Sequence, residues 1–252
     1  MMTGVEGRVA LVTGAGRGIG KATASLLASR GARVMCVSRN QPELEATGLD
    51  YVVADLGTVE GCELAVAETR RRLGPVEILV CNHGLGSAHE KVLWEQTPEV
   101  WEQSMRINLD GPFHLSRLVM PEMIAAGYGR LVYTASTAAK IAENAGSAYN
   151  ASKAGLLGLM RSVTTDGGAH GITANAVLPG WVRTEMAERS AAAEARERDI
   201  STEQVWEERS ALYPPGRVAT PDEVAQMIAF FASEESSGVS GESVRVALGS
   251  HW

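Results

Sequence analysis

The sequence predicts an α/β fold, a doubly wound seven-stranded parallel sheet with helices on both faces. Short apolar runs rich in β-branched residues alternate with longer amphipathic stretches, and this alternation is typical of repeated strand–helix–strand units. Most runs are apolar throughout, as parallel strands are when helices cover both faces of their sheet. The expected strands are residues 8–13, 32–38, 50–54, 77–81, 130–135, 172–178 and 243–248.

The amphipathic stretches between these runs predict the covering helices. The last of them begins with Pro221 after Thr220, which fits the preference of proline for the first turn of a helix. The link after the second strand is expected to be short. The expected helices are residues 18–30, 58–73, 98–126, 147–170 and 221–232.

The segment 184–215 departs from this alternation. It is rich in Glu, Arg and Ala and ends in Pro214 and Pro215. We interpret it as a small helical lid, and the alternative is an ordinary pair of solvated surface helices. Because the chain shows no internal repeat or low-complexity linker, we expect a single domain, 1–252. The apolar residues of the lid are Met186, Trp206, Leu212 and Tyr213.

The composition also suits one large globular domain. Of 252 residues, 45% are hydrophobic and 21% are charged. We find no apolar run that could span a bilayer and no signal peptide, so we expect a cytoplasmic protein. Cys36, Cys62 and Cys81 are too few and too scattered for a disulfide framework, and we expect free thiols. The net charge of -7 argues against binding to nucleic acid or to an anionic membrane.

A glycine-rich turn, Thr13 to Gly20, closes the first expected strand and opens the first helix. Glycines in this position let the backbone approach a pyrophosphate, and the helix N-terminus offers it unpaired N–H groups. The spacing of Gly14, Gly18 and Gly20 differs from the commoner G-x-G-x-x-G fingerprint. We predict a dinucleotide-binding Rossmann fold, against the alternative of a turn that merely requires glycine.

The residues after the second strand favour NADP(H) over NAD(H). NAD enzymes usually place Asp or Glu there to bind the ribose 2′-hydroxyl, whereas this chain has Ser38 and Arg39. Arg39 offers a permanently charged donor fork to a 2′-phosphate, and Arg17 adds a second cation. If Arg39 is only a solvated loop residue, NAD(H) stays possible. Asp55 is placed to bind the adenine amino group, and the backbone of residues 82–84 to pass the ribose.

Tyr149, Lys153 and the upstream Ser136 predict the chemistry. Residues four apart on a helix share a face, so the Lys153 ammonium is expected beside the Tyr149 phenol. A nearby cation lowers the pKa of tyrosine from about 10 toward values useful in proton transfer. This spacing alone also fits a solvated pair. Together with the other motifs it indicates a site of hydride transfer.

These motifs resemble those of the short-chain dehydrogenase/reductase family, and the likeness runs from Gly7 to about Ala247. It implies that Tyr149 is the acid–base residue and that Ser136 holds the carbonyl oxygen. Lys153 would bind the nicotinamide ribose and lower the pKa of Tyr149. The matching residues, besides the glycine turn, are Asp55, Asn108, Ser136, Tyr149, Lys153, Pro179, Gly180 and Thr184.

The resemblance also supplies the rest of the expected site. Asn108 would hold a water that connects Lys153 to a proton relay, and residues 179–184 would hold the nicotinamide carboxamide. Residues 85–94 and 136–139 are expected to form walls of the substrate pocket. The expected catalytic residues are Asn108, Ser136, Tyr149 and Lys153, with no metal. The expected cofactor-binding residues are Gly14, Arg17, Gly18, Ile19, Gly20, Ser38, Arg39, Asp55, Leu56, Asn82, Gly84, Tyr149, Lys153, Pro179, Gly180, Val182 and Thr184.

Two departures from the family pattern bear on the site and the assembly. His83 stands where the family usually has alanine; we predict a tolerated variant that packs in the core or bonds to backbone, and the alternative is contact with ribose or substrate. Near the C-terminus, Ala247, Leu248 and Gly249 replace the usual Asp-Gly-Gly at a common subunit contact. We expect a homotetramer or a homodimer.

Within the family, segments 144–156 and 170–180 resemble 3-oxoacyl-[acyl-carrier-protein] reductases, so a 3-oxoacyl thioester is the expected substrate. Residues 125–130 supply little of the basic surface that would dock an acidic carrier protein, which leaves such docking open. One alternative is a dehydrogenase of a free hydroxy acid or cyclic alcohol. Another is a catalytically silent dinucleotide-binding sensor, which we disfavour because all four expected catalytic residues are present.

Overall fold

The computed structural model describes residues 4–88 and 90–250, so both ends of the expected domain 1–252 and residue 89 lie outside the described residues. Its seven-stranded sheet has the order β3-β2-β1-β4-β5-β6-β7, and all neighbouring strands are parallel. The predicted doubly wound parallel fold is confirmed. The strands are β1 (Val9–Thr13), β2 (Arg33–Ser38), β3 (Asp50–Val53), β4 (Ile78–Cys81), β5 (Gly129–Thr134), β6 (Ile172–Pro179) and β7 (Ser243–Val246).

The central strands are buried on both faces, as their continuous apolar sequences predict. Every residue of β1, β4, β5 and β6 is buried, whereas the edge strands β3 and β7 are partly exposed. The chain runs from β1 out to β2 and β3 and then returns to β4 on the other side of β1. In such a sheet the crevice at the carboxyl ends of the strands, beside this reversal, is where ligands bind.

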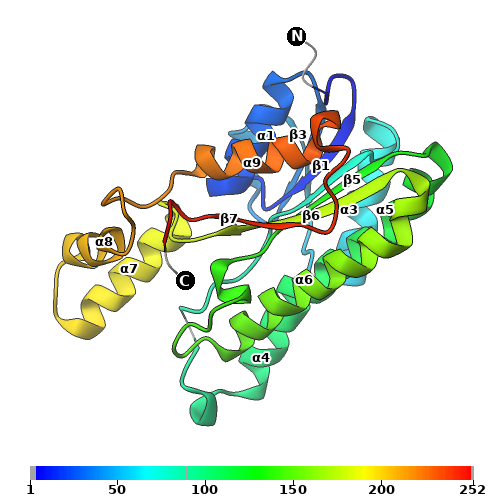
Figure 1. The fold of residues 1–252 in the computed structure, drawn as a ribbon. Helices are drawn as coiled ribbons and strands as arrows, with labels where there is room; N and C mark the ends of the chain where they lie inside the picture. The colour runs from blue at the N-terminus through cyan, green and yellow to red at the C-terminus, as the bar shows by residue number, and fades with distance from the viewer. Residues whose placement is uncertain (1–3, 89, 251–252) are drawn as a thin grey trace.

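Helices cover both faces of the sheet (Figure 1). Helices α1 and α9 pack together on one face, and α3, α5 and α6 cover the other. No helix in residues 4–88 and 90–250 is both long and apolar enough to cross a bilayer. The helices are α1 (Gly18–Ser29), α2 (Gln41–Glu45), α3 (Val59–Arg72), α4 (Pro98–Met105), α5 (Gly111–Ala126), α6 (Ser147–Gly167), α7 (Glu185–Arg198), α8 (Thr202–Ala211) and α9 (Pro221–Ala232). Shorter helical turns are η1 (Leu93–Glu95), η2 (Arg106–Asp110), η3 (Thr137–Ala139), η4 (Gly168–His170) and η5 (Glu234–Ser236).

Helix α9 begins at Pro221, as the sequence predicts, because a capping box fixes its start. The Thr220 side chain accepts a hydrogen bond from the Glu223 backbone N–H at 3.3 Å, and the Glu223 carboxylate accepts one from the Thr220 N–H at 2.9 Å. These bonds satisfy two backbone donors that the helix itself leaves free.

Two local expectations are corrected. The link after β2 contains the short helix α2, whose first turn forms because the Asn40 side chain accepts a hydrogen bond from the Glu43 N–H at 3.3 Å. The expected helix 98–126 is divided into α4 and α5 by the π-helical turn η2. Pro112 has no N–H, so the Asn108 carbonyl lacks the donor that an α-helix would supply four residues later. One residue before Pro112, the Gly111 N–H donates to the Arg106 carbonyl, five residues back, which is the hydrogen-bond pattern of a π-helix.

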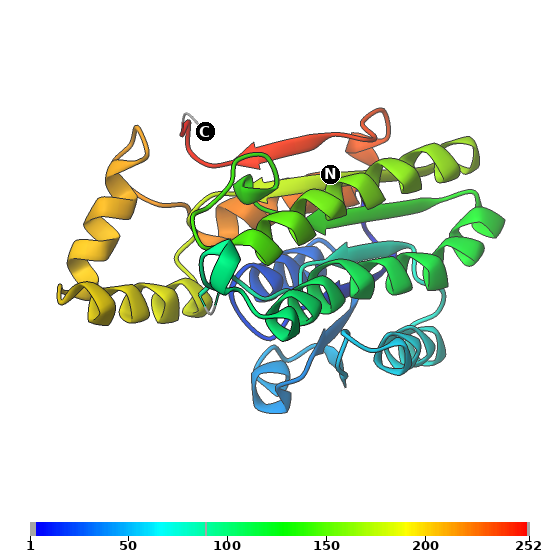
Figure 2. The same cartoon turned by 90° about the horizontal axis from the view of Figure 1, so that it is seen from below.

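The segment 184–215 forms the helical pair α7 and α8, which lies beyond the carboxyl ends of β6 and β7 (Figures 1 and 2). Ala187, Ala191 and Ala195 recur every four residues along α7, and these small side chains let α8 approach closely. They share a small apolar core with Trp206 and Tyr213. The pair therefore has a core of its own, separate from the two that line the faces of the sheet.

Candidate active site

The expected site residues meet at the carboxyl edge of the sheet. The glycine turn follows β1, Asn82 follows β4, Ser136 follows β5, and Pro179 ends β6. These strands are neighbours in the order β1-β4-β5-β6, so residues far apart in the sequence lie side by side. The sheet topology thus brings the predicted dinucleotide motif and the predicted proton-transfer residues into one region.

The glycine turn is a tightly packed cradle. A Cβ added at Gly20 would lie 2.1 Å from the Gly14 carbonyl oxygen, and the Gly14 φ of 63° is one that side-chain-bearing residues rarely adopt. The Asn82 N–H donates to Thr13 Oγ1 at 2.9 Å, which ties the start of the turn to the end of β4. This geometry fits a dinucleotide, because only bare backbone with outward N–H groups at a helix start can approach a pyrophosphate so closely.

An acidic residue that sequence reasoning missed lies at the predicted 2′-phosphate position. Arg17 Nη1 is 3.3 Å from Glu43 Oε1, and the Glu43 side chain packs against Gly16. Ser38 Oγ accepts a hydrogen bond from the Asn40 N–H at 3.2 Å, while Arg39 is exposed. Glu43 therefore offsets part of the positive charge that the sequence predicts. The Asn-x-x-Glu pattern at the start of α2 was the sequence signal that could have revealed Glu43.

The predicted adenine end of the site is built by the turn after β3. Asp55 Oδ1 accepts a hydrogen bond from the Gly57 N–H at 3.0 Å, and Asp55 Oδ2 lies 4.0 Å from Arg106 Nη1. Arg106 also donates to the Gly57 carbonyl at 3.2 Å. Leu56 is buried beneath this turn in the apolar core. The Asp55 carboxylate is thus held in place at the edge of the site, with more than a third of its side chain exposed.

Ser136, Tyr149 and Lys153 are brought together by β5 and α6. The Ser136 hydroxyl, which accepts a hydrogen bond from the Ala138 N–H at 3.1 Å, lies near enough to the Tyr149 phenol to affect its pKa. Lys153 is 5% exposed, its Nζ donates to the Thr134 carbonyl at 3.0 Å, and it lies 5.8 Å from the centre of the Tyr149 ring. The predicted shared face of the helix is confirmed.

The expected lowering of the Tyr149 pKa is not observed. Burial raises the pKa of Tyr149 to about 12, and the carboxylates of Glu143 and Glu90 add to the rise, whereas the nearby Ser136 hydroxyl opposes it. Burial also lowers the pKa of Lys153 to about 8. Helical spacing predicted the proximity of the two residues, but it could not reveal that burial would shift the pKa of each toward its neutral form. Tyr149 is thus a protonated phenol at neutral pH.

Asn108 is fully buried in the π-helical turn and fixes the loop after β4. Its Oδ1 accepts from the Leu85 N–H at 2.8 Å, and its Nδ2 donates to Leu85 O at 3.2 Å and to Ser152 Oγ at 3.0 Å. A Cβ at Gly84 would lie 3.0 Å from Asn108 Oδ1 and 3.3 Å from Lys153 Nζ. The side chain is occupied in positioning this loop, so the main-chain carbonyl is the group suited to hold a water for a relay.

The lid holds the turn that follows β6. The Tyr213 hydroxyl accepts a hydrogen bond from the Trp181 N–H at 2.6 Å and packs against Gly180. Thr184 caps α7 by accepting from the Ala187 N–H at 3.2 Å, and its methyl group faces Gly18 of the glycine turn. The predicted carboxamide-binding segment, including the buried Val182, therefore lies between the glycine turn and the lid. Ile19 packs against the apolar core below that turn.

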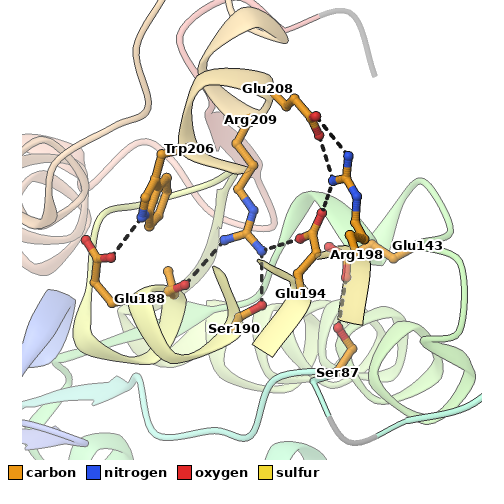
Figure 3. A network of polar contacts seen from close by, with 10 residues as sticks. Ser87, Glu143, Glu188, Ser190, Glu194, Arg198, Trp206, Glu208 and Arg209 are labelled. Carbon is orange, nitrogen blue, oxygen red and sulfur yellow. Dashed lines mark hydrogen bonds and ion pairs between the residues drawn. The ribbon is translucent and has the colours of Figure 1, made fainter. Parts of the chain in front are cut away.

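A buried arginine organises the lid (Figure 3). The Arg209 side chain is 6% exposed and donates to Ala187 O at 3.3 Å, Ser190 Oγ at 3.2 Å and Glu194 Oε2 at 2.8 Å. Its guanidinium also stacks 3.6 Å from the centre of the Trp181 ring. Arg209 thereby joins both lid helices to the turn after β6, a role that the charged, alanine-rich sequence did not disclose.

His83 is partly buried between the end of β1 and the start of α5. Its Nδ1 lies 2.8 Å from Thr13 Oγ1, and its Nε2 faces Gly111 at the start of α5. Burial, with the charge of Lys153 as a second cause, lowers the pKa of His83 to about 3. The imidazole is therefore neutral at physiological pH.

We expect His83 to make the fold sensitive to acid. Its pKa is about 6.5 when unfolded and about 3 when folded, so between these values the unfolded chain binds more protons and the free energy of unfolding falls as the pH falls. From pH 6.5 to about pH 4 this one group should lower the free energy of unfolding by ~3 kcal/mol. Urea unfolding of His83→Ala across this range should show a shallower decline than the parent chain. An unchanged slope would contradict the assignment, whatever the absolute stability of the variant.

Side chains with metal-ligand chemistry do not gather anywhere in residues 4–88 and 90–250, where no group of three or more His, Cys, Asp or Glu residues could hold a metal ion. Cys36, Cys62 and Cys81 are free and buried.

Comparisons with known proteins agree with this geometry. A family model described as enoyl-(acyl carrier protein) reductase matches residues 14–251. The 3-oxoacyl-[acyl-carrier-protein] reductase FabG of Escherichia coli (strain K12) is 32% identical, covering 96% of this chain and 96% of its own. The acetoacetyl-CoA reductase of Shinella zoogloeoides is 31% identical, covering 94% and 95%. A crystal structure of a variant actinorhodin polyketide ketoreductase with NADPH superposes with a TM-score of 0.91 at 34% identity, covering 96% of both chains.

Proposed function

Because the chain belongs to the short-chain dehydrogenase/reductase family, we propose that it is an NADP(H)-dependent oxidoreductase that interconverts a carbonyl and a secondary alcohol. The observation that carries the proposal is the cluster of the buried Ser136 and Lys153 with the partly buried Tyr149 at the carboxyl edge of the sheet, where the glycine turn also lies. The dinucleotide, when bound, supplies or accepts the hydride. A catalytically silent sensor would not need a complete set of proton-transfer residues.

The residues of the site suit carbonyl reduction. Tyr149 is protonated at neutral pH and can give its proton to the carbonyl oxygen as negative charge grows there. The Ser136 hydroxyl, near the phenol, can serve as a second donor to that oxygen. Lys153 lies close enough to stabilise the phenolate that this proton transfer leaves, and water held at the Asn108 carbonyl can return the proton.

NADP(H) is the proposed cofactor, with NAD(H) as the alternative. Arg39 is exposed and available to a 2′-phosphate, and the Ser38 hydroxyl lies beside it at the end of β2. A structural relative carries NADPH in its title. Arg17 also lies at this position but shares its charge with Glu43. The proposed NADP(H) preference therefore depends on Arg39 more than the sequence suggests.

A 3-oxoacyl thioester is the proposed substrate class. Relatives at 31–32% identity over nearly the whole chain are named for 3-oxoacyl-[acyl-carrier-protein] and acetoacetyl-CoA. Met186, 44% exposed on the lid, reaches Gly86 in the loop after β4, so an apolar side chain of the lid is available beside this loop to contact an acyl group. The alternative is a free hydroxy acid or a cyclic alcohol.

Initial rates of NADPH and NADH oxidation test this proposal. The carbonyl panel contains acetoacetyl-CoA, a 3-oxoacyl carrier-protein thioester, cyclic ketones and free keto acids, and the matching alcohols are run in reverse. We expect the highest kcat/KM for NADPH with a thioester. Turnover of a free alcohol with NAD⁺ alone would refute the proposed cofactor and substrate class, and the absence of any turnover would refute the enzyme itself.

We also propose a homotetramer or homodimer of single-domain subunits in the cytoplasm. Trp101, Phe113 and Ile124 are 40%, 46% and 39% exposed on α4 and α5, which supports burial of these helices against a second copy of the chain. The free buried cysteines support a reducing compartment.

A further inference from the structure

Two carboxylates flank the proposed proton donor. Glu90, in the loop after β4, accepts hydrogen bonds from the Ala148 N–H at 2.8 Å and the Tyr149 N–H at 2.7 Å. Gly146, at the start of α6, offers no side chain to cap this helix. The Glu90 carboxylate therefore provides the cap and fixes a negative charge beside the catalytic turn of α6.

Glu143 places a second carboxylate near the start of α6. Its main-chain N–H donates to Asn150 Oδ1 at 3.3 Å and its carbonyl accepts from Asn150 Nδ2 at 3.0 Å, so its backbone is anchored to α6. Its Oε2 accepts from Ser87 Oγ at 3.2 Å (Figure 3). Burial raises the pKa of the Glu143 carboxyl, and the bond from Ser87 opposes this rise. Ser87 is next to Gly86, the residue that Met186 of the lid reaches, so Glu143 lies where α6, the loop after β4 and the lid come together.

The lid arginine does not cancel these charges. Arg209 is buried among Ala187 O, Ser190 Oγ and the carboxylate of Glu194, so its donors serve the lid itself. Glu194 also neutralises its charge at 2.8 Å. A substrate carboxylate next to the reacting carbonyl would consequently approach the partly buried carboxylate of Glu143, and two like charges brought together repel.

We propose that Glu143 is a specificity-determining residue that excludes anionic carbonyl compounds, so that the substrate carries an uncharged group, such as an ester or thioester, next to its reacting ketone. This inference rests on the proposed function and deepens it. The inference distinguishes a thioester substrate from a free keto acid. Neither the fold nor the proton-transfer residues favour one of these two classes over the other.

A pair of four-carbon ketones tests the inference. Acetoacetate and the N-acetylcysteamine thioester of acetoacetate share the reacting ketone and differ in charge beside it. We expect the parent chain to favour the thioester by about 100-fold in kcat/KM. Glu143→Gln should reduce this ratio by about tenfold, chiefly through the KM for acetoacetate, and Glu143→Asp should keep the ratio high. The matched control Glu63→Gln, on the exposed face of α3, should leave the ratio unchanged.

Equal use of both ketones by the parent chain, or a ratio that Glu143→Gln does not alter, would overturn the inference. A measurement independent of turnover keeps it distinct from the proposed function. Butyramide and butyrate are titrated into the protein with NADPH, and NADPH fluorescence reports binding. We expect butyramide to bind more tightly than butyrate, and we expect this difference in affinity to be smaller in Glu143→Gln. Failure to reduce any ketone would refute the function, while equal binding of amide and acid would refute the role of Glu143.

Discussion

Replacement of Tyr149 by phenylalanine should lower kcat for carbonyl reduction by about 1,000-fold, because it removes the proton donor and leaves the shape of the pocket intact. The phenol is buried and protonated, and Ser136 and Lys153 stay in place around the new ring. Ser136 still stabilises the growing charge on oxygen, so some turnover above the uncatalysed rate should persist.

Cofactor affinity separates this loss of chemistry from a loss of folding. Titration of Tyr149→Phe with NADPH should give a Kd within a few-fold of the parent value, since only the hydroxyl is removed. Tyr51→Phe is the matched control, because Tyr51 lies on the edge strand β3 and its hydroxyl bonds only to the exposed Glu45. The Tyr51→Phe variant should reduce the carbonyl substrate with the kcat of the parent chain. Retained turnover in Tyr149→Phe would refute the assigned mechanism.

A reversal of cofactor preference is the second large expected effect. In the double variant Ser38→Asp with Arg39→Ala, a carboxylate able to accept bonds from a ribose 2′-hydroxyl replaces a cation able to bind a 2′-phosphate. A charge-assisted hydrogen bond is worth ~1.5–3 kcal/mol, so the ratio of the NADP⁺ and NAD⁺ dissociation constants should change by at least about 100-fold. Calorimetric titration with each cofactor measures this ratio without any need for turnover.

Glu43→Gln should move the preference in the opposite direction. It releases Arg17 from its ion pair and removes a negative charge from the 2′-phosphate position. Because the pair is partly exposed, a gain of only about two- to fivefold in NADP⁺ affinity is expected, and high salt should diminish it. If the double variant keeps the parent preference for NADP⁺ over NAD⁺ and Glu43→Gln does not change the NADP⁺ affinity, the 2′-phosphate is not recognised at this position.

The strands and the sites that follow them were predictable because both depend on local patterns. Continuous apolar runs can be buried only in a covered parallel sheet, and the carboxyl ends of such strands share one edge. The position of Ser136, Tyr149 and Lys153 in one cluster followed from this rule and from helical spacing. The break at Pro112 was also present in the sequence, but the long amphipathic stretch 98–126 concealed it, since amphipathic periodicity continues through a π-helical turn.

The sequence by itself determined the parallel α/β architecture and the glycine turn after the first strand, because periodicity and short-range spacing specify both. The proposed proton-transfer residues followed from the resemblance of their motifs to those of a known family. Only the tertiary structure decided the electrostatics of the site. The raised pKa of Tyr149, the pairing of Arg17 with Glu43 and the placement of Glu143 beside Ser87 all arise between segments distant in sequence. Burial and charge depend on three-dimensional neighbours, which local patterns do not encode.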